Sequence, residues 1–175
     1  MSNWIQTYTC KKFDINNFTD FDFCIEDIAH ALSNQCRFSG HVKKFYSVAQ
    51  HSVLVSFNCD PVFALQGLLH DASEAYLLDI PSPFKSTSIF EEYKKKEKAV
   101  QSLIYKRFNV PIDEHPSVKD SDRKLLATEA RDFMSPKHPD WNYPVEPLIH
   151  KIKPLVPTQA KKQFLLRFKE LSDAG

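Results

Sequence analysis

The chain has 175 residues, of which 42% are hydrophobic and 26% charged, and its formal net charge at pH 7 is +1. Such values are typical of one globular domain, so we expect a single domain over residues 1–175. The near-neutral charge does not favour a nucleic-acid-binding protein. Three glycines in the whole chain do not favour the glycine-rich loops of P-loop or dinucleotide-binding proteins.

The sequence also argues against a membrane or secreted protein. No stretch stays apolar for the roughly 20 residues that span a bilayer, and the first residues lack the basic-then-apolar pattern of a signal peptide. The cysteines form no Cys-x-x-Cys pair, so reduced thiols are expected rather than a zinc finger or a disulfide framework. We therefore predict a cytoplasmic protein with no membrane or nucleic-acid partner.

Hydrophobic periodicity predicts an all-α fold. Residues 1–20 form an aromatic-rich lead-in that fits a short strand or a packed arm equally well. Helices are then expected over 25–33, from Ser47 to before Pro61, and over 61–77, 89–107, 118–133 and 158–172. Ser47 and Gln50 have the spacing of a capping box. The proline-rich stretch 136–157 is expected to be a long ordered loop.

The end of the helix predicted over 61–77 carries an unusual group of polar residues. His70, Asp71, Glu74 and Asp79 follow the apolar run 63–69 within about three turns. In a regular helix His70 and Glu74 share a face, and Asp71 lies about 100° around it. Acidic residues are rarely buried unless they are paired or bind metal. The group therefore predicts a metal or catalytic site, with a solvated helix end as the alternative.

Residues elsewhere in the chain favour the site over the solvated helix end. His51 falls on the apolar face of the preceding predicted helix, and Asp122 lies near the start of a later one. Arg37 and Lys85 occupy neighbouring loops. A solvated helix end explains none of these four positions, whereas a metal site that binds an anionic substrate uses all of them.

Four segments resemble the HD-domain phosphohydrolases. They are SVAQHS at 47–52, HDASE at 70–74, DIPSPFK at 79–85 and DRKLLATE at 122–129. The likeness covers about residues 24–172 and is strongest to the 5′-deoxynucleotidase branch and its short phage relatives, which include dATP triphosphohydrolases. It implies a compact helical bundle with the metal site between the central helices, and residence in the host cytoplasm if the gene is a phage gene.

The resemblance also implies a role for each matched residue. The metal ligands would be His51, His70, Asp71 and Asp122; Asp122 is preferred to Asp120 because it directly precedes Arg123 and the LLATE run. Two imidazoles and two carboxylates suit a divalent ion such as zinc, cobalt, manganese or iron, with magnesium as a further option.

The remaining matched residues would act on the substrate. Glu74 resembles the family's acid/base residue, which could orient water or protonate the leaving oxygen. Arg37 and Lys85 resemble phosphate ligands, and Asp79 a carboxylate that contacts the sugar or supports the ligands. Phe38 could stack on a base, or be an ordinary core aromatic. His41, Lys43, Lys44 and Lys94 could extend the anion site, although an ordinary loop histidine is the preferred interpretation of His41.

The activity implied is hydrolysis of a deoxynucleotide substrate at its α-phosphorus. The short chain and the loop at 37–41 favour a deoxynucleoside triphosphate, above all dATP, as substrate, with the deoxynucleoside and triphosphate as products. A 5′-deoxynucleotidase acting on monophosphates is the first alternative. An HD phosphodiesterase and a non-catalytic nucleotide-binding protein are further alternatives. The resemblance also implies a homo-oligomer.

Overall fold

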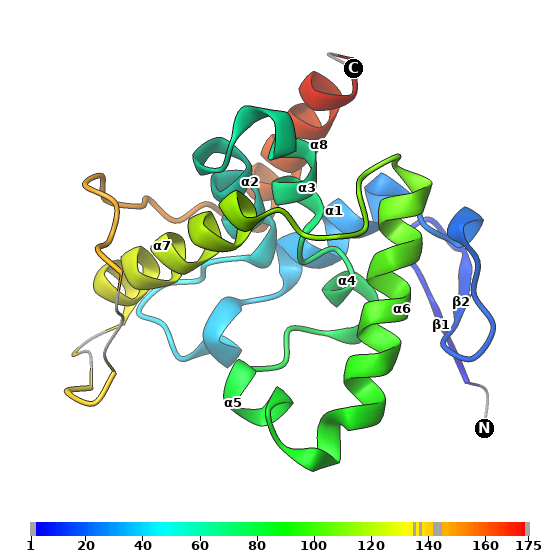
Figure 1. Ribbon diagram of the computed structural model, residues 1–175, viewed down its shortest axis with the longest axis horizontal. Helices are drawn as coiled ribbons and strands as arrows, with labels where there is room; N and C mark the ends of the chain where they lie inside the picture. The colour runs from blue at the N-terminus through cyan, green and yellow to red at the C-terminus, as the bar shows by residue number, and fades with distance from the viewer. Residues whose placement is uncertain (1–2, 135, 137, 142–144, 174–175) are drawn as a thin grey trace.

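The computed structural model describes residues 3–134, 136, 138–141 and 145–173, and most of its regular structure is helical (Figure 1). In chain order the elements are β1 (Trp4–Gln6), β2 (Lys12–Asp14), η1 (Asp20–Asp22), α1 (Ile25–Asn34), η2 (Arg37–Gly40), α2 (Val48–Asn58), η3 (Pro61–Phe63), α3 (Ala64–Leu69), α4 (Glu74–Leu77), α5 (Ser82–Lys85), η4 (Ser88–Phe90), α6 (Glu91–Arg107), α7 (Pro116–Phe133) and α8 (Pro157–Asp173). The long helices are confirmed to within two residues at each end. The described part of 136–156 contains no helix or strand, and Pro157 begins α8.

The lead-in corrects the all-α prediction, because it forms a small β-hairpin. Strands β1 and β2 pair antiparallel, with Ile5 opposite Phe13. Phe13 is 3% exposed, and its ring lies 4.7 Å from that of Tyr76 and 5.9 Å from that of Phe23. Burial of this one aromatic side chain on the helical core explains why a segment without helical periodicity is ordered here.

A buried carboxylate ties this lead-in to α1. Asp27 is 3% exposed and accepts hydrogen bonds from the Thr9 backbone N–H at 2.7 Å, the Thr9 hydroxyl at 2.9 Å and the Cys24 thiol at 2.9 Å. Burial raises the pKa of Asp27, but the hydrogen bonds from Cys24 and Thr9 outweigh it and hold the pKa below its ordinary value. The ionised carboxylate therefore stabilises the folded state.

Asp27→Asn is expected to lower the free energy of unfolding at pH 7 by about 2 kcal/mol, since hydrogen bonds to a charged group contribute about that much. The folded pKa of Asp27 is depressed, so its contribution is complete above the ordinary carboxyl pKa of about 3.9 and is lost as the pH falls through the folded value. Urea unfolding at pH 7 and pH 3 checks both points. Equal stability of the two proteins at pH 7 would contradict this assignment.

Helix α2 lies at the centre of the molecule. It packs against α1, α3, α7 and α8, and Figure 1 places α7 on one side of the α2–α3 pair and α6 on the other. The predicted apolar face is confirmed, because Val48, His51 and Val55 are fully buried. This central position brings a histidine of α2 to the meeting point of three helices.

The start of α2 confirms half of the predicted capping box. The Ser47 side chain accepts a hydrogen bond from the Gln50 backbone N–H. The Gln50 side chain does not return to the cap. It donates to the Lys153 carbonyl at 2.7 Å and accepts from the Leu155 N–H at 2.9 Å, so it holds the chain that leads into α8.

The helix predicted over 61–77 is wrong as a single element. It is divided into η3, α3 and α4, with a turn over 70–73 between the last two. The physical reason lies on α6. The amide of Gln101 accepts from the Ser73 N–H at 2.9 Å and donates to the Leu69 carbonyl at 2.7 Å, so it occupies both groups of one helical hydrogen bond. A side chain inserted in this way interrupts a helix.

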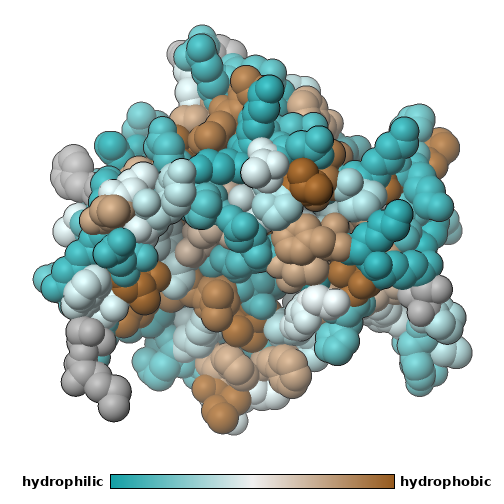
Figure 2. Space-filling model, turned by 180° about the vertical axis from the view of Figure 1, so that it is seen from behind, coloured by the Kyte–Doolittle hydropathy of each residue, from teal (hydrophilic) through white to brown (hydrophobic). Residues whose placement is uncertain are grey.

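No helix among the described residues is long and apolar enough to cross a membrane. On the face seen in Figure 2, apolar residues are interspersed with polar ones. The exposed large apolar side chains come from distant parts of the chain, among them Val62, Ile89 and Ile149. The homo-oligomer therefore stays a prediction.

Candidate metal centre

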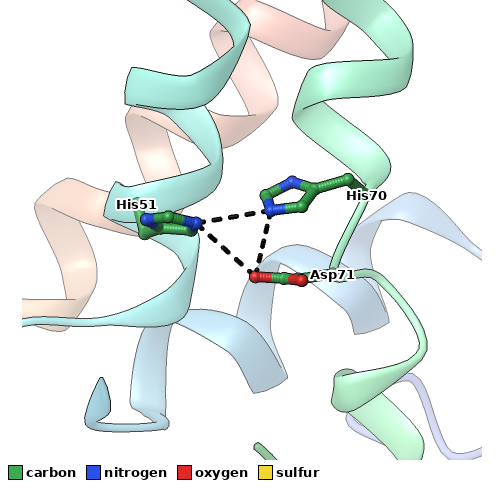
Figure 3. A group of neighbouring side chains, drawn as sticks. All are labelled: His51, His70 and Asp71. Atoms are coloured by element: carbon green, nitrogen blue, oxygen red, sulfur yellow. Dashed lines mark hydrogen bonds and ion pairs between the residues drawn. The ribbon is translucent and has the colours of Figure 1, made fainter. Parts of the chain in front are cut away.

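Three predicted ligands converge where α2 meets the end of α3. His51 comes from α2, His70 directly follows α3, and Asp71 begins the turn after it (Figure 3). The two Nε2 atoms are 3.3 Å apart, and Asp71 Oδ2 lies 3.2 Å from His70 Nε2 and 3.7 Å from His51 Nε2. All three atoms lie within 4.8 Å of one another, a spacing that could hold one metal ion.

The remaining ring nitrogens determine which atoms can bind metal. His51 Nδ1 lies 2.6 Å from a Glu129 carboxylate oxygen, and His70 Nδ1 lies 2.9 Å from the Gly67 carbonyl oxygen. Because both partners accept hydrogen bonds, each Nδ1 carries a proton, and each neutral ring has a lone pair at Nε2. Two such lone pairs 3.3 Å apart need a cation or a shared proton between them. The donor set therefore fits a divalent metal ion.

The fourth predicted ligand, Asp122, adjoins the same group from α7. Its Oδ1 lies 3.1 Å from His51 Nε2. Its side chain is 37% exposed, whereas that of Asp71 is 22% exposed. Asp122 therefore approaches the group from the more exposed side. Asp120 is exposed and lies 3.8 Å from Arg123 on the same helix, which supports the preference for Asp122.

The group is electrostatically suited to a cation. Burial and Arg37 lower the pKa of His51, but Glu129 and Asp122 outweigh them and raise it to about 9. Burial raises the pKa of Asp71, but His70, His51 and Arg37 hold it well below its ordinary value. The carboxylates thus stabilise positive charge at the two imidazoles, and a metal ion would replace that charge.

Glu129 is the residue that sequence reasoning missed. It is fully buried on α7; one oxygen accepts from His51 Nδ1 and from the Tyr46 hydroxyl at 2.9 Å, and the other accepts from Arg37 Nε at 3.1 Å. Burial raises the pKa of Glu129, but Arg37 and His51 lower it below its ordinary value. Its position seven residues after Asp122, two turns along the same helix face, was the available signal.

Arg37, a predicted phosphate ligand, bridges two acids of the centre. Besides its bond to Glu129, its Nη1 lies 3.5 Å from Asp71 Oδ2, and its side chain is 11% exposed. Burial lowers its pKa, but Glu129 and Asp71 raise it well above the ordinary value. Arg37 thus contacts both Glu129, whose carboxylate orients His51, and Asp71, whose carboxylate faces both Nε2 atoms.

Glu74, the predicted acid/base residue, lies beside the centre at the start of α4. It is 6% exposed, its Oε1 is 3.5 Å from Lys85 Nζ, and its Oε2 is buried with no hydrogen-bond partner among the described residues. Burial, then Asp71 and Asp79, raise the pKa of Glu74 well above its ordinary value. Lys85 also lies 2.6 Å from Glu97 of α6. The surroundings of Glu74 next to Asp71 therefore disfavour its charged form.

Two cavities flank the centre. One, of about 310 Å³, is lined by His70, Asp71, Glu74 and Lys85 and by side chains of α6 that include Lys94 and Lys98. The other, of about 610 Å³, is lined by the predicted residues Arg37, Phe38 and Asp79, and by His41, Phe84 and Trp141. The Phe38 and Trp141 rings meet edge to face at 6.0 Å. Lys43 and Lys44 line neither of these two cavities.

The comparisons with known proteins give sequence relatives but no family description. No protein-family model matches the chain. The chain is 38% identical over 175 residues to the uncharacterised protein YfdR of Escherichia coli (strain K12), a match that covers 98% of this chain and 97% of YfdR. It is also 32% identical over 121 residues to an uncharacterised protein of Rhodobacter capsulatus, across 62% of this chain and 59% of that protein.

Proposed function

We propose that this chain, which belongs to the same family as YfdR of Escherichia coli, is a metal-dependent phosphohydrolase of the HD-domain type that cleaves deoxynucleotides at the α-phosphorus. The observation that carries the proposal is the pair of imidazole Nε2 atoms facing each other at 3.3 Å beside the Asp71 carboxylate. Both Nδ1 protons are already donated, to Glu129 and to the Gly67 carbonyl. Histidines that bind metal are oriented in this way.

His51, His70 and Asp71 would hold the ion, with Asp122 as the fourth ligand. Zinc, cobalt and manganese suit such a nitrogen and oxygen donor set. A divalent ion in this position lowers the pKa of water and offsets charge on phosphoryl oxygens. The arrangement leaves the face toward the 310 Å³ cavity for the substrate, because His70 and Asp71 both line that cavity.

Glu74 is suited to donate a proton to the departing 5′-oxygen. Its carboxyl group is buried, and burial, then the neighbouring carboxylates of Asp71 and Asp79, raise its pKa well above the ordinary value and so favour the protonated form. A general acid needs this state before the reaction. Lys85, 3.5 Å away, can contact a phosphoryl oxygen and stabilise the resulting carboxylate.

The two cavities support an orientation for the substrate. The aromatic side chains of Phe38, Phe84 and Trp141 give the larger cavity a surface for a nucleoside. Lys94 and Lys98 of α6 give the smaller cavity positive charge beyond Lys85. Charge beyond the α-phosphorus is of use to a triphosphate and not to a monophosphate, so dATP is favoured over dAMP as substrate.

Product analysis by chromatography tests the proposal. The chain is incubated with each deoxynucleoside triphosphate and monophosphate in zinc, cobalt, manganese or magnesium. We expect dATP to give deoxyadenosine and triphosphate, and a chelator to abolish the reaction. A preference for monophosphates would overturn the triphosphate assignment. Absence of hydrolysis of either class with every metal would overturn the enzymatic proposal.

Lys98→Ala is expected to raise the KM for dATP about two- to fivefold, the range for one exposed charge interaction, and to leave the KM for dAMP unchanged. Lys98 is exposed and lines the smaller cavity. Lys95→Ala is the matched control, because Lys95 is exposed on the same helix, pairs with Glu92 and lies outside that cavity. Steady-state kinetics at low salt checks the difference, since salt screens such charges. Equal KM changes for dATP in both variants would refute this role.

A further inference from the structure

The turn that carries His70 and Asp71 is held by the side chain of Gln101, on α6. Gln101 accepts from the Ser73 N–H at 2.9 Å and donates to the Leu69 carbonyl at 2.7 Å. In a regular α-helix the Ser73 N–H would donate directly to the Leu69 carbonyl. The inserted amide keeps these two groups satisfied but apart, so α3 ends at Leu69 and the helical path is interrupted at the ligands.

The backbone next to the insertion takes a tighter path. The N–H groups of Ala72 and Glu74 bond to carbonyls three residues earlier, those of Leu69 and Asp71, and the N–H of Ala75 bonds to Ala72. Side chains three residues apart eclipse one another in such 3₁₀ turns. Asp71 and Glu74 are therefore brought to the same side, and both line the 310 Å³ cavity. In a continuous α-helix Glu74 would align with His70 instead.

The other end of the segment is held in the same manner from α1. Gln35, which directly follows α1, donates to the Glu74 carbonyl at 2.9 Å and accepts from the Asp79 N–H at 3.1 Å. The Glu74 carbonyl also accepts from the Leu78 N–H at 2.9 Å. Glutamine amides thus hold both ends of the segment between Leu69 and Asp79.

We propose that Gln101 is a positioning residue of the metal centre: by replacing one helical hydrogen bond with its own amide, it sets the 3₁₀ turn that points Asp71 at the two imidazoles and places Glu74 beside it. This inference rests on the proposed function, because it assigns a purpose to the turn within that site. Loss of the amide lets the Ser73 N–H and the Leu69 carbonyl bond directly. The turn then relaxes toward α-helix and carries Asp71 away from the position where its Oδ2 meets both Nε2 atoms.

The test uses Gln101→Met, whose side chain has a similar length and shape but offers no amide. We expect the dissociation constant for Co²⁺ to rise about tenfold or more, as for loss of other groups that orient metal ligands, and the visible absorption spectrum of bound Co²⁺ to change. For dATP, kcat should fall more than KM rises. If this variant does not fold, Gln101→Asn retains an amide on a shorter stem and should show an intermediate change.

Gln66→Met is the matched control. The Gln66 amide also bridges backbone groups, donating to the carbonyls of Pro111 and Asp113 at 2.9 Å and accepting from the His115 N–H at 2.8 Å, but these groups belong to the loop before α7. Gln66→Met should lower the melting temperature and leave Co²⁺ affinity within about twofold of wild type, as expected away from the ligands' supporting contacts.

Three outcomes would overturn the inference in distinguishable ways. If wild-type protein binds Co²⁺ and hydrolyses dATP, but Gln101→Met leaves both the affinity and the spectrum unchanged, the positioning role is wrong and the proposed function stands. Equal losses of Co²⁺ affinity in Gln101→Met and Gln66→Met would show that Gln101 supports the fold in general and does not specifically position the metal ligands. If wild-type protein binds none of Co²⁺, Zn²⁺ and Mn²⁺, the proposed function fails, and the inference fails with it.

Discussion

Asp71→Asn is expected to lower the metal-dependent hydrolysis rate about a thousandfold, because a metal ion supplies several kcal/mol of transition-state stabilisation and each 1.36 kcal/mol is a factor of ten. Asp71 Oδ2 lies within 3.7 Å of both imidazole Nε2 atoms and 3.5 Å from Arg37. An amide in this position is neutral and a much weaker ligand for a divalent ion. The excess positive charge of Arg37 would then further disfavour metal.

The measurement for this variant combines kcat for dATP with metal content per chain after dialysis. Asp120→Asn is the matched control, because Asp120 is exposed and pairs only weakly with Arg123, at 3.8 Å. The Asp120→Asn variant should retain wild-type activity. The Asp122→Asn variant should lose activity, as the Asp71→Asn variant does. Circular dichroism verifies that each variant is folded. Retention of more than about a tenth of the wild-type rate by Asp71→Asn, a loss under 1.4 kcal/mol, would refute its role as a ligand.

Glu129→Gln is expected to weaken metal binding about 10- to 100-fold, the usual effect of losing the partner of a metal-ligating histidine. Its two oxygens contact different donors, His51 and Tyr46 on one side and Arg37 on the other. A glutamine can offer only one oxygen. Since Arg37 cannot accept a hydrogen bond, the amide oxygen must face Arg37 and the NH₂ group must face His51. His51 Nδ1 then becomes an acceptor, and the proton moves to Nε2, where it blocks the metal.

Calorimetric titration with Mn²⁺ measures this effect, and imidazole NMR resonances report the tautomer. Tyr46→Phe is the control that separates tautomer control from packing. It removes one hydrogen bond to Glu129, keeps the acceptor for His51, and retains a ring to stack on Phe133, 4.5 Å away. Tyr46→Phe should bind Mn²⁺ within about threefold of wild type, a change below 1 kcal/mol. Unchanged Mn²⁺ affinity in Glu129→Gln would contradict the tautomer argument.

The sequence predicted the long helices well, because each has a strong apolar periodicity and clear end signals. Ser47 at the start of α2 is an example, since its side chain accepts from the Gln50 N–H. The break after Leu69 could not be predicted in this way. It depends on Gln101, more than 30 residues away, and no local pattern in 61–77 records that contact. The sequence does not distinguish the hairpin from a packed arm, because strands of three residues show too little alternation of polar and apolar side chains.

In the candidate site too, residue type and order predicted some features, whereas others depend on tertiary contacts. Residue type and order indicated His51, His70, Asp71 and Asp122, and the structure places the last three of these side chains around His51 Nε2. Glu129 lies in the segment DRKLLATE, but the sequence alone does not indicate its role, because a buried carboxylate can be recognised only when its partners are known. Arg37 was expected to meet phosphate alone. Its bonds to Glu129 and Asp71 depend on the packing of η2 against α7, which the sequence does not encode locally.

Hydrolysis of dATP in water enriched in ¹⁸O tests the central claim most directly. The proposed reaction adds water at the α-phosphorus, breaks its bond to the 5′-oxygen and transfers a proton to that oxygen. With Mn²⁺ or Co²⁺ present, the account predicts deoxyadenosine without ¹⁸O and triphosphate that contains one ¹⁸O atom per turnover, with no product after chelation. Release of orthophosphate or pyrophosphate, ¹⁸O in the deoxyadenosine, or undiminished turnover after chelation would contradict it.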